Sequence, residues 1–236
     1  MSLDTHEYTH LKADEATQLA AELYGLRCAA SPLPSEYDDN FHLTAATGEE
    51  FVLKVMHPGR ERSFIDLQCK ALQHVAQRAP ALSLPRVCTA PDGSTLTAIT
   101  GPDGAQRLAW MLTYVPGRML AEVRPHSDEL LFSLGRLLGQ IDAALKDFAH
   151  PAAQRELKWD LTQAVWIRDY IKYVTDPTRR ALVDRLLTMY ESEVLLVLAH
   201  LRRCIIHGDA NDYNVLVATP RAQTPPAVSV IDYGDM

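Results

Sequence analysis

The chain lacks an excess of positive charge. Its 236 residues carry 23 lysines and arginines against 30 aspartates and glutamates, which gives a formal net charge of −7 at pH 7. Proteins that bind nucleic acids depend on a basic surface that neutralises phosphates. The sequence therefore argues against a nucleic-acid partner, and its acidity is compatible with a cationic substrate such as an amine.

The chain also lacks a long apolar run and a regular cysteine pattern. Its longest apolar run, Val194 to Ala199, is far too short to span a bilayer, so we expect no membrane partner. Its first residues show neither the basic region nor the apolar core of a signal peptide. No C-x-x-C pair or regular spacing relates the cysteines at 28, 69, 88 and 204, which argues against a disulfide or zinc framework. We therefore expect a cytoplasmic protein with reduced, buried thiols.

The pattern of apolar and turn residues changes at Pro116-Gly117. Before this point, the periodicity predicts β structure with one long helix, and after it mainly helices, with short strands returning from Cys204. The predicted helices are 14–24, 61–78, 127–147, 160–174 and 178–201, and the predicted strands of the first half are 40–44, 50–56, 86–90, 94–100 and 107–114. We therefore predict an α+β fold with a β-rich N-terminal lobe, residues 1–115, and a mainly helical C-terminal lobe, residues 116–236, that carries the motifs described next.

Four polar residues near the end of the chain stand beside short apolar strands, in an order that suits phosphoryl transfer. His207, Asp209 and Asn214 form a His-x-Asp-x-x-x-x-Asn pattern, and a later apolar strand ends at Asp232. Such transfer needs a carboxylate that receives the proton of the acceptor hydroxyl, and oxygen ligands that hold metal ions. We predict that Asp209 is the catalytic base, on a loop held by His207. Asn214 and Asp232 are the predicted ligands of Mg²⁺, which prefers hard oxygen donors. Each element alone is typical of a turn or a strand end, and only their combination favours catalysis.

The residues around this pattern resemble the aminoglycoside phosphotransferase and choline kinase superfamily, which shares the bilobal protein-kinase fold. His-Gly-Asp at 207–209 stands where protein kinases have His-Arg-Asp, and Ile-Asp-Tyr-Gly at 231–234 where they have Asp-Phe-Gly. The segment Gly-Asp-Ala-Asn-Asp-Tyr-Asn-Val-Leu-Val at 208–217 is most similar to one subgroup. That subgroup contains hydroxylysine kinases and the kinase-like domains fused ahead of class III aminotransferases. The resemblance covers nearly the whole chain.

The resemblance implies a nucleotide site in the first half of the chain. Lys54, which alternates with apolar neighbours on a predicted strand, would pair with the α- and β-phosphates of ATP. The loop before it, residues 34–41, contains no glycine, although protein kinases use glycines there to bring backbone amides close to phosphates. Ser35 and Asn40 are the candidates for nucleotide contact in this loop.

Three further features belong to the implied site. Asp38 and Asp39 would repel phosphate, so we expect them to order the turn. Gln68 stands where the family has a Glu that holds the lysine, and an uncharged partner makes a weaker hydrogen bond. The segment 111–117 resembles the hinge between the lobes, where the backbone groups of Thr113 and Val115 would hold the adenine.

We therefore predict an ATP- and Mg²⁺-dependent small-molecule kinase that phosphorylates a hydroxyl of an amino acid, an amine or an aminoglycoside-like acceptor. Hydroxylysine is the favoured acceptor, and the choice between ATP and GTP stays open. The alternative is a non-catalytic or truncated kinase-like nucleotide-binding module, because Gln68 replaces the expected Glu and family members continue past Met236. On this basis we expect a C-terminally truncated chain, and a fusion to or association with an aminotransferase domain.

Overall fold

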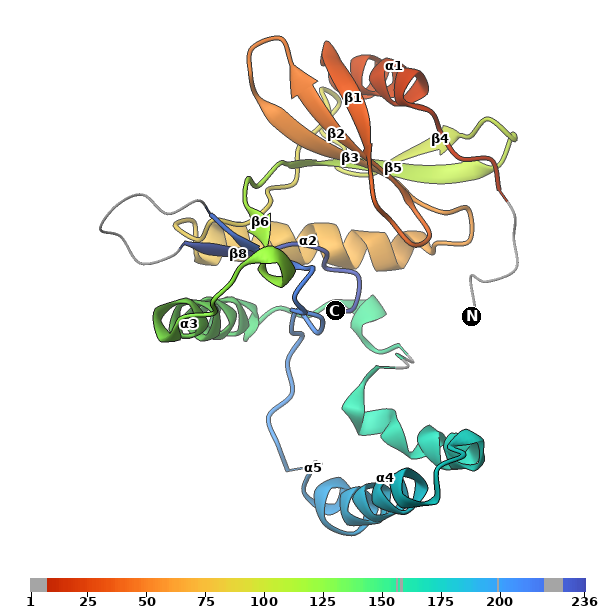
Figure 1. The fold of residues 1–236 in the computed structure, drawn as a ribbon. Coiled ribbons are helices and arrows are strands. Elements are labelled where there is room, and N and C mark those ends of the chain that lie inside the picture. Colours follow the sequence, from red (N-terminus) through yellow and green to blue (C-terminus); the bar gives the residue numbers. More distant parts are fainter. Residues whose placement is uncertain (1–7, 156, 158, 199, 219–226) are drawn as a thin grey trace. The chain divides into compact units, whose positions relative to one another are not determined.

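The computed structural model describes residues 8–155, 157, 159–198, 200–218 and 227–236 (Figure 1). The chain divides into two compact units, which are treated separately: Met1–Ala153 with Ile205–Gly234 and Met236, and Gln154–Cys204 with Asp235. The lobe boundary expected at residue 115 lies inside the first unit and stays a prediction. The N-terminal residues 1–7, in which no signal peptide was expected, lie outside the described residues, as does Ala199 of the predicted helix 178–201.

An antiparallel five-stranded sheet organises the first unit. Its strands follow the order β1-β2-β3-β5-β4 and are β1 (Cys28–Leu33), β2 (Asp39–Ala45), β3 (Glu50–Val55), β4 (Thr97–Thr100) and β5 (Gln106–Thr113). The strands predicted at 40–44, 50–56 and 107–114 are confirmed, and the one predicted at 94–100 is shorter. The strand predicted at 86–90 is wrong: this segment meets β5 in a single bridge between Val87 and Leu112, because β4 occupies the neighbouring part of that edge.

Strand β1 has no strong sequence signal, since Cys28–Leu33 contains a proline and few β-branched residues. It forms as an edge strand paired only with β2, where Pro32 lies opposite Phe41. Proline is tolerated at an edge because it removes no hydrogen bond from the interior of the sheet.

Alternation along the strands separates two hydrophobic faces. Phe41, Leu43, Leu53 and Val55 pack with α1 (Ala13–Tyr24) on one face. Trp110 and Leu112 of β5 pack with α2 (Arg62–Arg78) on the other face, and Figure 1 shows the two helices on opposite sides of the sheet. Lys54 shares the second face with Val52 and Trp110, as the alternation predicts. Both helices confirm their predictions, and α1 ends at Gly25, whose φ of 65° lies in the left-handed region that glycine adopts most easily.

A small second sheet carries the polar motifs. Its strands follow the order β6-β7-β8 and are β6 (Arg118–Met119), β7 (Val215–Val217) and β8 (Val228–Val230). Helix α3 (Asp128–Leu145), predicted at 127–147, packs against β8 and α2. Short turns of helix, η1 (Leu120–Glu122) and η2 (Pro151–Ala153), complete the described part of this unit.

The second unit departs from the predicted pair of α-helices. The segment predicted as a helix at 160–174 is a 3₁₀ helix, η3 (Leu161–Tyr173), and the longer predicted helix consists of α4 (Pro177–Met189), a π-turn η4 (Tyr190–Val194) and α5 (Leu195–Leu198). The π-turn begins where Tyr190 and Glu191 bind η3. The guanidinium of Arg168 donates to Glu191 at 2.6 and 2.8 Å and to Asp184 at 2.6 Å. These polar bonds tie η3 to α4 and η4.

The four cysteines are expected to carry reduced, buried thiols. All four thiols are free. Burial raises the pKa of Cys69 to about 12. Cys28 and Cys88 are half-buried and Cys204 is exposed, so the expectation that all four thiols are buried is confirmed for Cys69 and wrong for Cys204. None of the helices in the described part of the chain combines the length and the apolar character that a bilayer span requires.

Replacement of the buried Arg107 by Met is expected to lower the free energy of unfolding by about 3 kcal/mol. Its side chain is fully buried and donates to Asp39 at 3.3 Å, to Asp103 at 2.7 Å and to the carbonyl of Thr9 at 2.8 Å. The variant would leave these acceptors without their buried cation. Urea unfolding followed by circular dichroism measures the loss.

An exposed ion pair provides the matched control for this prediction. Arg78 binds Asp147 on the surface, and its replacement by Met is expected to cost no more than about 1 kcal/mol. Equal losses in the two variants would show that burial does not govern the contribution of Arg107.

Candidate active site

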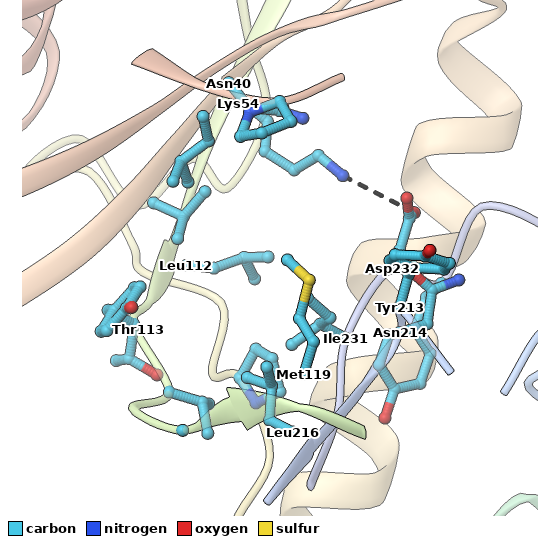
Figure 2. A pocket seen from close by; sticks show the side chains of 18 of the residues that line it. Asn40, Lys54, Leu112, Thr113, Met119, Tyr213, Asn214, Leu216, Ile231 and Asp232 are labelled. Atoms are coloured by element: carbon cyan, nitrogen blue, oxygen red, sulfur yellow. Dashed lines mark ion pairs between the residues drawn. The ribbon is translucent and has the colours of Figure 1, made fainter. Parts of the chain in front are cut away.

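A cavity of about 440 Å³ lies in the first unit, between the five-stranded sheet and the β6-β7-β8 sheet (Figure 2). Apolar side chains from both sheets line it, among them Val52, Leu112, Met119, Leu216 and Ile231. Polar groups gather at one side, and Figure 2 shows Asp232 and Asn214 across the cavity from Thr113. Apolar walls with a few convergent polar groups are typical of a small-molecule site.

The structure brings most of the residues singled out in the sequence to this cavity. Those that line it are Asn40, Lys54, Thr113, Val115, Asn214 and Asp232. His207 and Asp209 do not line it. Asp209 accepts a hydrogen bond from Asn214, and His207 bonds to the carbonyl of Ile231, and both of these partners line the cavity. Ser35 and Gln68 are not among its lining residues.

Lys54 and Asp232 form the charged end of the cavity. The Lys54 ammonium lies 3.7 Å from Oδ1 of Asp232 and 5.7 Å from the centre of the Trp110 ring. The lysine side chain is 11% exposed and the aspartate side chain 53% exposed. The pair therefore lies at the cavity wall, with its carboxylate open to a ligand.

The backbone at Asp232 directs this carboxylate. Its φ of 59° lies in the left-handed region, which aspartate tolerates better than most residues at a cost of about 1 kcal/mol. The ammonium of Lys54 holds the pKa of Asp232 below its usual range, against the opposing effect of the partial desolvation of this carboxylate. The ion pair accordingly stabilises the fold above the unfolded-state pKa, and this contribution is lost as the pH falls through the lowered folded-state pKa.

The β7-β8 pairing places Asn214 beside Asp232. Val215 lies opposite Val230, so Asn214 lies opposite Ile231, whose N–H donates to the Asn214 carbonyl at 2.8 Å. The Asn214 amide nitrogen donates to Oδ2 of Asp209 at 2.7 Å and to the Asp209 carbonyl at 3.0 Å. No described residue donates to the Asn214 amide oxygen, which leaves that oxygen available to a cation.

His207 shapes the loop that presents Asp209. Its Nδ1 accepts the N–H of Asp209 at 3.2 Å, and its Nε2 lies 3.1 Å from the carbonyl of Ile231. This pair of bonds fits a neutral imidazole protonated on Nε2. Gly208 between them has a φ of 79°, which explains why a glycine occupies the middle of the motif. The buried histidine thus joins the Asp209 loop to the strand that leads to Asp232.

The glycine-free loop is ordered by its two aspartates, as expected. Asp38 accepts the N–H of His57 at 2.8 Å and pairs with Arg60 at 3.1 Å, and Asp39 pairs with Arg107. Ser35 closes the turn by accepting the N–H of Asp38 at 3.2 Å.

Within this loop, Asn40 is the predicted nucleotide contact that reaches the cavity, which Pro34 also lines. It lies opposite Lys54 in the β2-β3 register and lines the cavity. Its buried amide oxygen has no partner among the described residues. This oxygen is therefore available to a donor group of a ligand.

Gln68 does not line the cavity, whereas Thr113 and Val115 of the expected hinge do. Gln68 is buried on α2, but no described hydrogen bond links it to Lys54, whose charged partner is Asp232 instead. Thr113 is held by Arg86, which donates its N–H to the threonine hydroxyl at 2.9 Å. The N–H of Val115 makes no hydrogen bond to any described residue, so it is available to a ligand in the cavity.

Several site residues were not singled out in the sequence. Met119, Glu122 and Tyr213 line the cavity, and Asn211 donates to Oδ1 of Asp209 at 2.8 Å. Tyr213 and Asn211 lie inside the motif, so their proximity to it was a usable signal. Met119 and Glu122 carry no local signal, because only the pairing of β6 with β7 brings them to the site.

The sequence profile of the phosphotransferase enzyme family matches residues 29–236. The hydroxylysine kinase of Mus musculus is 30% identical over 243 residues, which cover 94% of this chain and 64% of that protein. The chain therefore spans less than two thirds of the length of this relative.

Two solved structures share the fold. A microcompartment-associated aminopropanol kinase has a TM-score of 0.66 and 18% identity, covering 95% of this chain and 70% of the other. An amicoumacin kinase in complex with AMP-PNP and Ca²⁺ has a TM-score of 0.64 and 17% identity, covering 95% and 64%. These likenesses confirm the expected α+β kinase fold.

Proposed function

Since this chain belongs to the phosphotransferase enzyme family, we propose that it transfers the γ-phosphoryl group of ATP to a hydroxyl of a small amine or amino acid. The observation that carries the proposal is the meeting of Lys54, Asn214 and Asp232 in one cavity. Asp209 accepts a hydrogen bond from the side-chain amide of Asn214, which lines that cavity. A cation for phosphates, oxygen ligands for a metal and a carboxylate for the acceptor are the groups that phosphoryl transfer requires.

The oxygen atoms at the charged end fit a magnesium ion. The amide oxygen of Asn214 has no described donor, and Oδ2 of Asp232 accepts no described hydrogen bond. The described residues contain no cluster of three or more His, Cys, Asp or Glu that could hold a metal, so the proposed site rests on Asp232 and Asn214. One carboxylate and one amide suit Mg²⁺, which keeps several waters and binds substrate phosphates. When bound, the ion would neutralise the charge of the phosphates.

Each side chain has a defined task in this proposal. Lys54 binds phosphate oxygens, and Asp209 orients the acceptor hydroxyl and accepts its proton. The Val115 N–H, together with the apolar side chains around it, binds the adenine. The solved amicoumacin kinase in complex with AMP-PNP and Ca²⁺ supports a nucleotide with a divalent ion.

The acceptor is proposed from the relatives and from the acidity of the chain. The mouse relative is a hydroxylysine kinase, and hydroxylysine joins a hydroxyl group to a cationic amine. The net charge of −7 suits a cationic substrate. Hydroxylysine is therefore the acceptor to test before aminoglycosides.

The decisive experiment compares hydroxylysine with lysine, which lacks only the hydroxyl. We expect nucleotide turnover and a phosphorylated product, detected by mass spectrometry, with hydroxylysine and Mg²⁺ but not with lysine or without the metal. ATP and GTP are assayed in parallel. Turnover that does not distinguish the two amino acids would contradict transfer to the hydroxyl.

The alternative of a non-catalytic module is not favoured, because Lys54, Asn214 and Asp232 meet in one cavity and Asp209 is hydrogen-bonded to Asn214. We also propose that the protein acts in the cytoplasm, where thiols such as the exposed Cys204 stay reduced.

A further inference from the structure

We propose that Asn211 is a positioning residue for the carboxylate of Asp209, an inference that rests on the proposed phosphoryl transfer. The Asn211 side-chain nitrogen donates to Oδ1 of Asp209 at 2.8 Å. The Asn214 nitrogen donates to the other oxygen, Oδ2, at 2.7 Å. Because rotation about the last torsion of an aspartate is only weakly restricted, two amides on opposite oxygens hold the carboxylate in one orientation.

The orientation of the Asn211 amide follows from the backbone. Its oxygen accepts the N–H of Tyr213 at 2.8 Å. A backbone N–H only donates, so the amide oxygen faces Tyr213 and the amide nitrogen must face Asp209. The carbonyl of Asn211 also accepts the N–H of Asn214 at 3.0 Å. One turn therefore presents both amides to the same carboxylate.

This arrangement leaves the carboxylate able to act on an acceptor. Each carboxylate oxygen has about two lone-pair sites, of which an amide occupies one. The remaining sites are open to the acceptor hydroxyl, in a direction that the two amides set. Loss of the Asn211 bond would let the carboxylate rotate, and small misplacements of reacting groups lower rates strongly. Since Asn211 is not among the residues that line the cavity, nucleotide affinity should not depend on it.

Replacement by Asp separates this role from a purely structural one. In Asn211→Asp a side-chain oxygen still accepts the Tyr213 N–H and keeps the turn, but an oxygen replaces the donor that faces Asp209. A residue that only builds the turn predicts wild-type kcat for Asn211→Asp and a loss for Asn211→Ala. Positioning predicts that kcat of Asn211→Asp falls by about tenfold or more, at least as far as in Asn211→Ala, with the nucleotide Kd unchanged. Gln77→Glu, at an exposed position of α2, controls for one added negative charge.

The experiment combines kinetics with NMR of the Asn211 side-chain amide, identified by its absence in Asn211→Asp. Positioning predicts a lower kcat with unchanged nucleotide Kd, and amide signals that shift in Asp209→Ala. Wild-type kcat in a folded Asn211→Asp variant would overturn the inference, and so would Asn211 signals that do not move in Asp209→Ala. If the wild type phosphorylates no acceptor, the proposed function fails, and the NMR measurement alone decides the contact between Asn211 and Asp209.

Discussion

Replacement of Asp209 by Asn is expected to lower kcat for the acceptor by about 10²- to 10⁴-fold, the usual contribution of a positioned acid–base group. The nucleotide Kd should stay close to that of the wild type, because Asp209 is not among the residues that line the cavity. The variant keeps the shape of the side chain but removes the charge that accepts the proton. Steady-state kinetics with saturating nucleotide, together with isothermal titration of the nucleotide, separates the two effects.

Asp212 is the matched control for this prediction. It is an exposed neighbour whose side chain makes no hydrogen bond to any described residue, and only its carbonyl accepts a bond, from Ala121. Asp212→Asn should therefore retain near-wild-type kcat. If both variants lost the same activity, local charge and not the carboxylate of Asp209 would account for the effect.

Replacement of Asp232 by Asn is expected to abolish the dependence of nucleotide binding on Mg²⁺. Affinity measured with Mg²⁺ should fall by more than about tenfold, since even outer-shell partners of a metal contribute that much. Affinity measured without Mg²⁺ should be equal to or higher than that of the wild type. The reason is that Lys54 loses its carboxylate partner, 3.7 Å away, and becomes available to phosphate.

Isothermal titration of ATP with and without Mg²⁺ tests both signs in one protein. Asp92→Asn is the matched control, because Asp92 lies in an exposed turn where Asn also accepts the N–H of Ser94. A metal dependence preserved at the wild-type level in Asp232→Asn would remove Asp232 from the metal site. The pKa of Asp232 is held below its usual range by Lys54, so titrations at neutral pH compare a charged carboxylate with a neutral amide.

Local patterns were sufficient to predict most elements of the first unit. The alternation at 50–56 predicted a strand with Lys54 on the face opposite Leu53 and Val55, and the structure confirms it. This works because a strand has a period of two residues whatever it packs against. The segment at 160–174 shows the limit of such local patterns. Apolar spacing does not distinguish an α-helix from a 3₁₀ helix, which this segment forms.

The sequence by itself determined the chemical groups of the site and their local presentation. The presentation of His207, Asp209 and Asn214 follows from short-range turns, in which Gly208 adopts its left-handed backbone and His207 accepts the N–H of Asp209. Such contacts join residues that are close in the chain, so a motif can report them.

Tertiary structure decided which groups meet across the chain. Lys54 has Asp232 as its charged partner, although the resemblance implied Gln68. Arg107 binds Asp39, at the end of the loop formed by residues 34–41, and Met119 joins the cavity through the pairing of β6 with β7. These contacts depend on the packing of two sheets and their helices, and residues distant in sequence carry no local pattern that records which of them the packing brings together.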